Sequence, residues 1–227
     1  MVQSTDAQRP LRRRARNFRN EEFANFLTHG SGLLLALAGA AVLFSAADRI
    51  YSDAMRVSCW VYGMALIAVY AASTLSHMFE NPARRHFFRS LDQGMIFLFM
   101  AANFTPLAIV HLPYANRWSV LTVMWAIALV GFISKVFWGH RVESISITQY
   151  LVLAWLPITA IGPLLKSIPV DGAFLFAAGG AAYTTGIVFL ALDSRVRYFH
   201  ALWHLFVIAG SLCHFLVIVD YAIPIIA

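Results

Sequence analysis

The chain alternates between long apolar segments and short polar ones. Seven apolar segments each come close to the length of about 20 residues that crosses a hydrocarbon core of about 30 Å as a helix. Lipid offers backbone amides no hydrogen-bond partner, so each segment is expected to be helical. The pattern therefore predicts an all-α membrane protein, a bundle of seven transmembrane helices at residues 26–46, 55–77, 91–111, 118–138, 146–165, 172–191 and 200–220.

Two prolines interrupt the fifth segment, Pro157 and Pro163. Neither has an amide hydrogen to donate, but we expect both to kink the helix without ending it, because neighbouring helices can bind the freed carbonyl groups. The connections between segments are too short to hold a second domain. We therefore expect a basic cytoplasmic tail at residues 1–22 and a single membrane domain at residues 23–227.

Composition supports a membrane protein and argues against other classes. The 227 residues are 60% hydrophobic and 12% charged, whereas soluble domains are typically about 25% charged. The net charge of +6 is compatible with nucleic-acid binding, but the Lys and Arg residues lie mainly in the N-terminal tail and at the borders of apolar segments. We therefore expect no nucleic-acid partner. Cys59 and Cys213 lie inside apolar segments, which predicts neither a disulfide framework nor a cysteine zinc site.

The distribution of basic residues predicts the orientation in the membrane. With the N-terminus inside, only Arg49, Arg56, Arg117 and Lys166 fall on the outer side, and the other 13 of the 17 Lys and Arg residues fall on the inner side. Cytoplasmic loops are the ones enriched in Lys and Arg. The distribution therefore predicts a cytoplasmic N-terminus and a C-terminus outside.

Ionisable residues in spanning segments are costly in lipid and therefore mark candidate functional sites. In the seven-helix arrangement His77 ends the second helix, and Asp92 begins the third just after a basic loop. His200 and His204 begin the seventh helix, again at its inner end. Three segments that are distant in sequence thus bring three histidines and a carboxylate to one depth in the membrane.

The spacing of these residues on their helices points to a metal. His200 and His204 are four residues apart, as are Ser73 and His77, so each pair lies on one helix face. Three imidazoles that leave a fourth position open to water are typical of catalytic zinc. Asp92 is then expected to orient the water, to take its proton or to hold a histidine tautomer. Imidazole also suits other divalent metals, and histidines at helix ends can simply meet lipid headgroups.

Four separated motifs resemble the bacterial hemolysin III proteins, which belong with the progestin and adipoQ receptor family. The motifs are Glu21–Asn25 with Thr28–Gly30, Ser73–His77, Leu91–Asp92 with Ala101–Pro106, and Phe199–His204 with His214. The resemblance implies a seven-helix fold in the plasma (inner) membrane with its N-terminus inside. It also implies zinc on His77, His200 and His204, with Asp92 and Ser73 around a metal-bound water.

The leading hypothesis for function is a zinc-dependent hydrolase of a membrane-lipid amide or ester, because related receptors are proposed to cleave lipid amides such as ceramide. Asp92 and Ser73 are then the expected catalytic residues, and membrane lipids and zinc the expected partners. One alternative is a non-enzymatic membrane sensor or homeostasis protein with a structural zinc. A transport or membrane-lysing protein is the third class. It predicts polar residues across the outer half of the bundle, where the sequence has few.

Two further histidines are not expected to bind the metal. His214 lies ten residues past His204, about 15 Å further along the helix, which is too far to share an ion. It is either a buried hydrogen-bonded side chain or a polar contact for a substrate that enters from the lipid. His29, together with Glu22 and Asn25, is expected either to brace the site or to serve packing alone.

Overall fold

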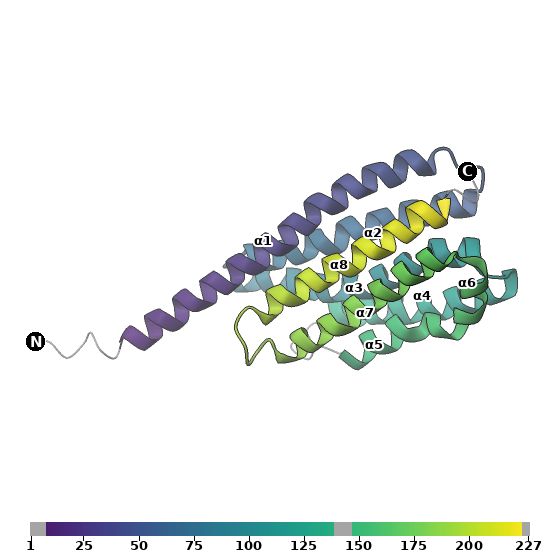
Figure 1. Ribbon diagram of the computed structural model, residues 1–227. Helices are drawn as coiled ribbons and strands as arrows, with labels where there is room; N and C mark the ends of the chain where they lie inside the picture. Colours follow the sequence, from purple (N-terminus) through teal and green to yellow (C-terminus); the bar gives the residue numbers. More distant parts are fainter. Residues whose placement is uncertain (1–7, 139–146, 224–227) are drawn as a thin grey trace, which may run out of the picture.

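The computed structural model describes residues 8–138 and 147–223, and its regular elements there are helices (Figure 1). Seven of its helical segments are long and apolar enough to span a membrane, with α5, η2 and α6 together forming one of them. The seven-helix fold predicted from the sequence is thus confirmed. The helices are α1 (Gln8–Ala47), α2 (Asp53–Met78), α3 (Pro82–His111), α4 (Tyr114–Phe137), α5 (Ile147–Trp155), the 3-10 helix η2 (Leu156–Ala160), α6 (Ile161–Ser167), α7 (Val170–Leu192) and α8 (Phe199–Tyr221).

Sequential helices pack against one another, α1 on α2, α2 on α3, α3 on α4 and α7 on α8, and α8 also contacts α1. α2 and α3 are the most buried of the spans and form the centre of the bundle. α7 is the least buried span and is held mainly by α8. The start of α1 and the end of α8 lie at opposite ends of the bundle, as an odd number of spans requires (Figure 1).

The first helix begins earlier than its apolar segment. α1 starts at Gln8, within the stretch expected to be a polar tail, and its first turns project beyond the end of the bundle where α7 and α8 join (Figure 1). Pro10 is tolerated because the first turn of a helix has no use for its missing amide hydrogen. The Arg, Leu and Ala residues that follow have high helix propensity. The helical backbone therefore continues through polar sequence into the membrane-spanning part.

The third helix also begins well before its apolar segment, which corrects the expected basic loop ahead of Asp92. Asn81 accepts hydrogen bonds from two backbone amides of the first turn, and Pro82 opens the helix. A capping Asn followed by Pro is a common helix start. Arg85 and Arg89, four residues apart, therefore lie on one helix face instead of in a loop.

The fifth span changes geometry at its first proline. α5 ends at Trp155, Pro157 lies in the first turn of η2, and α6 begins at Ile161. Pro157 has no amide hydrogen to bond the carbonyl group four residues earlier, so the chain adopts a tighter 3-10 turn. The segment still has the length and composition of a span, but it is broken into three helices where a simple kink was expected.

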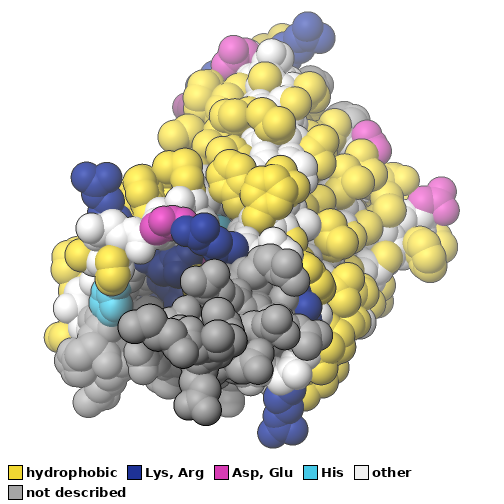
Figure 2. Space-filling view, turned by 90° about the vertical axis from the view of Figure 1, so that its left-hand side faces the viewer, with side chains coloured by type: hydrophobic (Ala, Val, Ile, Leu, Met, Phe, Trp, Pro, Cys, Tyr) yellow, Lys and Arg dark blue, Asp and Glu magenta, His cyan; other side chains and the backbone are white. Residues whose placement is uncertain are grey.

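One end of the bundle carries most of the described charged side chains, and we call it the charged end. Figure 2 shows Arg and Lys side chains beside acidic ones at this end, whereas hydrophobic side chains cover the flanks of the bundle. The charged end comprises the part of α1 around Arg19–Glu22 and the connections from α2 to α3 and from α7 to α8. Its residues include Arg19, Glu21, Glu22, Glu80, Arg84, Arg85, Arg89, Asp193, Arg195 and Arg197.

Candidate metal centre

Three histidines from two helices meet at the charged end. His77 lies in the last turn of α2, and His200 and His204 lie in the first turns of α8. One ligand nitrogen from each ring lies within 4.8 Å of the other two. The ring centroids are 5.3 Å apart for His77 and His200, 5.2 Å for His77 and His204, and 4.5 Å for His200 and His204. The structure thus brings together the three residues expected as metal ligands.

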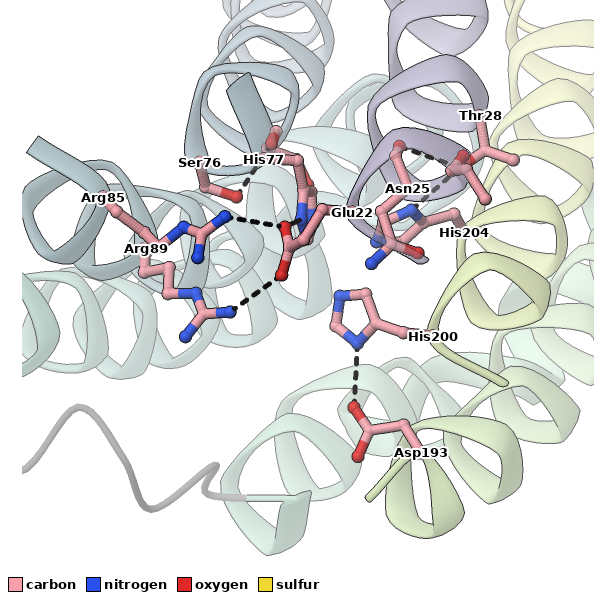
Figure 3. Close-up of polar contacts among 12 residues, drawn as sticks. Glu22, Asn25, Thr28, Ser76, His77, Arg85, Arg89, Asp193, His200 and His204 are labelled. Carbon is pink, nitrogen blue, oxygen red and sulfur yellow. Dashed lines mark hydrogen bonds and ion pairs between the residues drawn. The ribbon is translucent and has the colours of Figure 1, made fainter. Parts of the chain in front are cut away.

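Two of these rings bind a carboxylate through Nδ1 (Figure 3). His77 Nδ1 lies 2.8 Å from Glu22 Oε2, and His200 Nδ1 lies 2.8 Å from Asp193 Oδ2. A carboxylate can only accept a hydrogen bond, so Nδ1 carries the proton in both rings. In the neutral imidazole Nε2 then keeps its lone pair, which is the form that binds a metal.

The third ring is oriented by a hydroxyl group. His204 Nδ1 lies 3.0 Å from Thr28 Oγ1 on α1. The same hydroxyl lies 3.0 Å from the backbone oxygen of Ala24 and 2.9 Å from that of Asn25. Its single proton goes to one of these carbonyl groups, so Thr28 Oγ1 accepts from His204 Nδ1. His204 therefore has the same tautomer as the other two histidines.

The three rings together fit a divalent metal ion. With every Nδ1 engaged, Nε2 is the nitrogen that each ring can offer. His77 Nε2 is buried and has no hydrogen-bond partner among the described residues. Buried polar atoms are nearly always paired, so this nitrogen requires a partner. Three neutral imidazoles form a donor set that zinc and related ions bind well.

Glu22 is itself fixed by two arginines from α3 (Figure 3). One guanidinium nitrogen of Arg85 lies 3.3 Å from Glu22 Oε2, and one of Arg89 lies 3.6 Å from Oε1. The Glu22 side chain is only 12% exposed, and both of its oxygens are paired at this largely buried position. Because these arginines lie on one helix face, the early start of α3 has a direct effect on the orientation of His77.

Asp92 and Ser73 lie beside the histidines and line the same cavity. Asp92 is not part of the group of mutually close ligand atoms, but it is near enough to His200 to interact with it electrostatically. Ser73 is buried next to Asp92, and its hydroxyl group makes no hydrogen bond of standard geometry with the described residues. Both groups therefore share the cavity on which the three histidines border.

His29 contacts the histidine cluster from α1. Its ring centroid lies 3.6 Å from that of His204 and 5.3 Å from that of Tyr70. Both of its ring nitrogens are buried and have no hydrogen-bond partner within the part of the chain that the structure describes. His29 therefore packs on His204 and, like His77, carries buried nitrogen atoms that require a partner.

Reasoning from the sequence missed the groups that hold two of the histidines. Asp193 precedes His200 by seven residues in the connection from α7 to α8, and a carboxylate so close to a candidate ligand was a usable signal. Thr28 gave no such signal, because only the packing of α1 on α8 brings it to His204. Glu22 belongs to one of the four motifs, but nothing in the sequence indicated that it contacts His77.

A cavity of about 1410 Å³ runs from the histidine cluster into the bundle. At the charged end it is lined by Glu22, His77 and Asp92, and deeper by Asn103 and His214. α5, η2, α6 and α7 line it mostly with apolar side chains, including Ile158, Leu165, Phe176 and Ile187. The cavity is partly open to the surface, and two of its apolar lining residues, Ile158 and Leu165, are also exposed. Its size and lining suit a long apolar ligand.

A seven-helix bundle with a histidine cluster above an apolar cavity defines a multi-pass membrane protein with a candidate metal centre. The model of the haemolysin-III related family matches residues 17–215. The chain therefore belongs to the hemolysin III family, and the resemblance drawn from the four motifs is confirmed.

Individual relatives match over nearly the whole chain. The chain is 34% identical to Hemolysin-3 of Bacillus cereus over 211 residues, covering 93% of this chain and 96% of the relative. It is 31% identical to the Hemolysin-3 homolog of Bacillus subtilis (strain 168) over 205 residues, covering 90% and 96%. The human Monocyte to macrophage differentiation factor is 29% identical over 210 residues, covering 88% and 84%.

Proposed function

We propose that this protein is a zinc-dependent hydrolase that cleaves an amide or ester bond of a membrane lipid, an activity like that of a ceramidase. The observation that carries the proposal is the hydrogen bonding of all three histidine Nδ1 atoms, which leaves three Nε2 atoms for one ion at the mouth of an apolar cavity. His77, His200 and His204 hold the zinc. When bound, zinc polarises a carbonyl group and activates water for attack on it.

Asp92 and Ser73 supply the remaining chemistry. Asp92 accepts a proton from the attacking water and donates it to the leaving nitrogen or oxygen. The bond from the water oxygen to the carbonyl carbon forms, and the bond to the leaving group breaks. The Ser73 hydroxyl group, which makes no hydrogen bond of standard geometry with the described residues, donates to the carbonyl oxygen as negative charge develops on it.

The position of the site suits a lipid substrate. The histidines lie at the ends of two spanning helices, so a polar linkage can reach them at the level of the headgroups. The apolar cavity then accepts the acyl chain, and its opening to the surface provides an entry from the bilayer.

The basic residues of the charged end favour a cytoplasmic site. The charged end carries Arg19, Arg84, Arg85, Arg89, Arg195 and Arg197 among the described residues. Basic residues next to spanning helices favour the cytoplasmic side. We infer that the N-terminus and the metal centre face the cytoplasm, and that the chain resides in the plasma membrane.

A structural zinc in a non-enzymatic sensor is the second candidate, and one observation favours it. α2 and α8 supply the three ligands, yet they pack mainly on other helices and little on each other. An ion on His77, His200 and His204 joins these two helices and stabilises the bundle whether or not it takes part in a reaction.

Removal and return of the metal test the proposed reaction. Purified protein stripped of zinc by a chelator is expected to lose ceramide cleavage, because the histidines alone cannot activate water. Added zinc should restore the cleavage, whereas magnesium should not, since it prefers oxygen ligands. Product release from labelled ceramides and phospholipids is the measurement. Zinc-loaded protein that cleaves none of these lipids contradicts the hydrolase and favours the structural zinc.

The carboxylate behind His77 gives a second prediction. Glu22→Gln is expected to weaken zinc binding by about 10-fold to 100-fold. The carboxylate fixes the tautomer of His77 and raises the basicity of its ring, and the neutral amide does neither. Glu21→Gln is the matched control, since Glu21 pairs instead with Arg197 at 2.6 Å. Competition with a chromogenic chelator measures both affinities. Equal zinc affinity in the two variants would show that Glu22 does not act through His77.

A further inference from the structure

Asn103 on α3 and His214 on α8 form a second polar cluster deep in the cavity. Both side chains are buried, and both line the cavity. Asn103 follows Asp92 by 11 residues on α3 and His214 follows His204 by 10 residues on α8. At 1.5 Å per residue, each helix places the pair about 15 Å from the metal centre. This depth is near the middle of a hydrocarbon core of about 30 Å.

The hydrogen bonds of this pair determine which way the Asn103 amide points. His214 Nε2 lies 3.1 Å from the backbone oxygen of Phe176, which can only accept, so Nε2 donates and Nδ1 carries the lone pair. Asn103 Nδ2 lies 2.6 Å from His214 Nδ1 and donates to it. The other amide atom, Asn103 Oδ1, is buried and has no hydrogen-bond partner in the described ranges.

The nearby hydroxyl groups do not satisfy this oxygen. Tyr183 also lines the cavity, but its hydroxyl group lies 3.0 Å from Ser211 Oγ. The Tyr70 hydroxyl group donates to the same serine at 3.0 Å. A buried acceptor without a donor is destabilising, and more so where lipid excludes water. Asn103 Oδ1 therefore requires a donor from a molecule in the cavity.

We propose that Asn103 Oδ1 binds a hydroxyl group carried part-way along the acyl chain of the lipid ligand. The inference rests on the proposed function only for the choice of a lipid, since the binding itself needs neither zinc nor turnover. The site takes a chain that is apolar for about 15 Å beyond the polar linkage and then presents one O–H donor. A plain acyl chain leaves Asn103 unsatisfied, and a chain that carries only an acceptor, such as a ketone, does the same.

The small residues of α7 make room for such a chain. Gly180 lines the cavity one helical turn from Phe176 toward the charged end, and a Cβ atom added there meets nothing within 4 Å. Gly179 has the opposite role, because a Cβ atom there would lie 2.3 Å from the ring of His214. Gly179 thus lets α7 approach His214 and place the Phe176 carbonyl group, while Gly180 keeps open the path between the pair and the histidines.

A binding assay without turnover tests the proposal. Zinc-free wild-type protein in detergent is titrated with stearic acid, with stearic acid hydroxylated in mid-chain and with stearic acid hydroxylated next to the carboxyl group, each displacing a fluorescent fatty acid. The mid-chain hydroxyl is expected to bind about 10-fold tighter than either other acid, the effect of one hydrogen bond to an otherwise unpaired group. Asn103→Leu should reduce the difference to within about twofold.

Thr105→Val is the matched control. Thr105 lies on the same helix at a similar depth but does not line the cavity, and its hydroxyl group accepts a hydrogen bond from Trp125 Nε1. Thr105→Val leaves the partly buried Trp125 Nε1 without this acceptor, much as Asn103→Leu leaves His214 without its donor, and should keep the preference for the mid-chain hydroxyl.

Two results would overturn the proposal. Equal affinities of the three acids for the wild type would show that Asn103 Oδ1 does not select a hydroxyl group and that water suffices for it. A preference that persists in Asn103→Leu would assign the recognition to another residue. The wild-type series is decisive alone if Asn103→Leu does not fold. Neither result alters zinc content or lipid hydrolysis, so this failure is distinguishable from failure of the proposed function.

Discussion

Replacing His204 by alanine is expected to lower the zinc content of the purified protein from about one ion per chain to background. The variant removes one of three Nε2 ligands and leaves two imidazoles on different helices, too few to hold the ion. His204 is almost fully buried, at 1% exposure, so nearby polar groups at the surface cannot replace it. Elemental analysis of protein purified in detergent measures the effect.

His214→Ala is the matched control, because it removes a histidine from the same helix about 15 Å from the centre. That variant should keep the zinc content of the wild type. Equal zinc in wild type, His204→Ala and His214→Ala would remove the basis for a metal at this site.

Replacing Asp92 by asparagine should lower the rate of lipid hydrolysis by about 10²-fold to 10⁴-fold, the usual contribution of a positioned general acid–base group. Asparagine has nearly the same shape but cannot exchange the proton. The zinc content should stay unchanged, because Asp92 lies outside the group of mutually close ligand atoms. Turnover of a labelled ceramide and elemental analysis on the same preparation measure the two effects.

Asp171→Asn serves as the comparison for this variant. Asp171 is an exposed carboxylate in the first turn of α7, at the opposite end of the bundle, and its loss should leave hydrolysis intact. Full turnover in Asp92→Asn would exclude the proton-transfer role of Asp92.

The spans were predictable because lipid leaves a polypeptide few choices of structure. A segment without charge and of sufficient length must form a helix in the membrane, so composition alone identified all seven. The helix ends were less predictable, since an end depends on local capping. Asn81 and Pro82 start α3 among polar residues, and Pro157 changes the fifth span to a 3-10 helix.

The candidate site was predictable to the extent that depth determines it. His77, His200 and His204 share one end of the bundle because the second helix ends there and the seventh begins there. Their partners depend on how each helix is rotated about its axis, which packing decides. Thr28 faces His204 only because α1 packs on α8, and no periodicity in the sequence contains that information.

The position of α7 couples ligand binding in the cavity to metal binding by the histidines. α7 lines the cavity with Phe176 and Gly180, and Asp193, immediately beyond its last residue, holds His200. A ligand that displaces α7 therefore also moves the carboxylate that orients a metal ligand. Thermodynamic linkage requires the reverse as well, so a filled metal site changes the affinity of the cavity for its ligand by the same factor. Lipid occupancy of the cavity and zinc occupancy of the histidines would then each depend on the other.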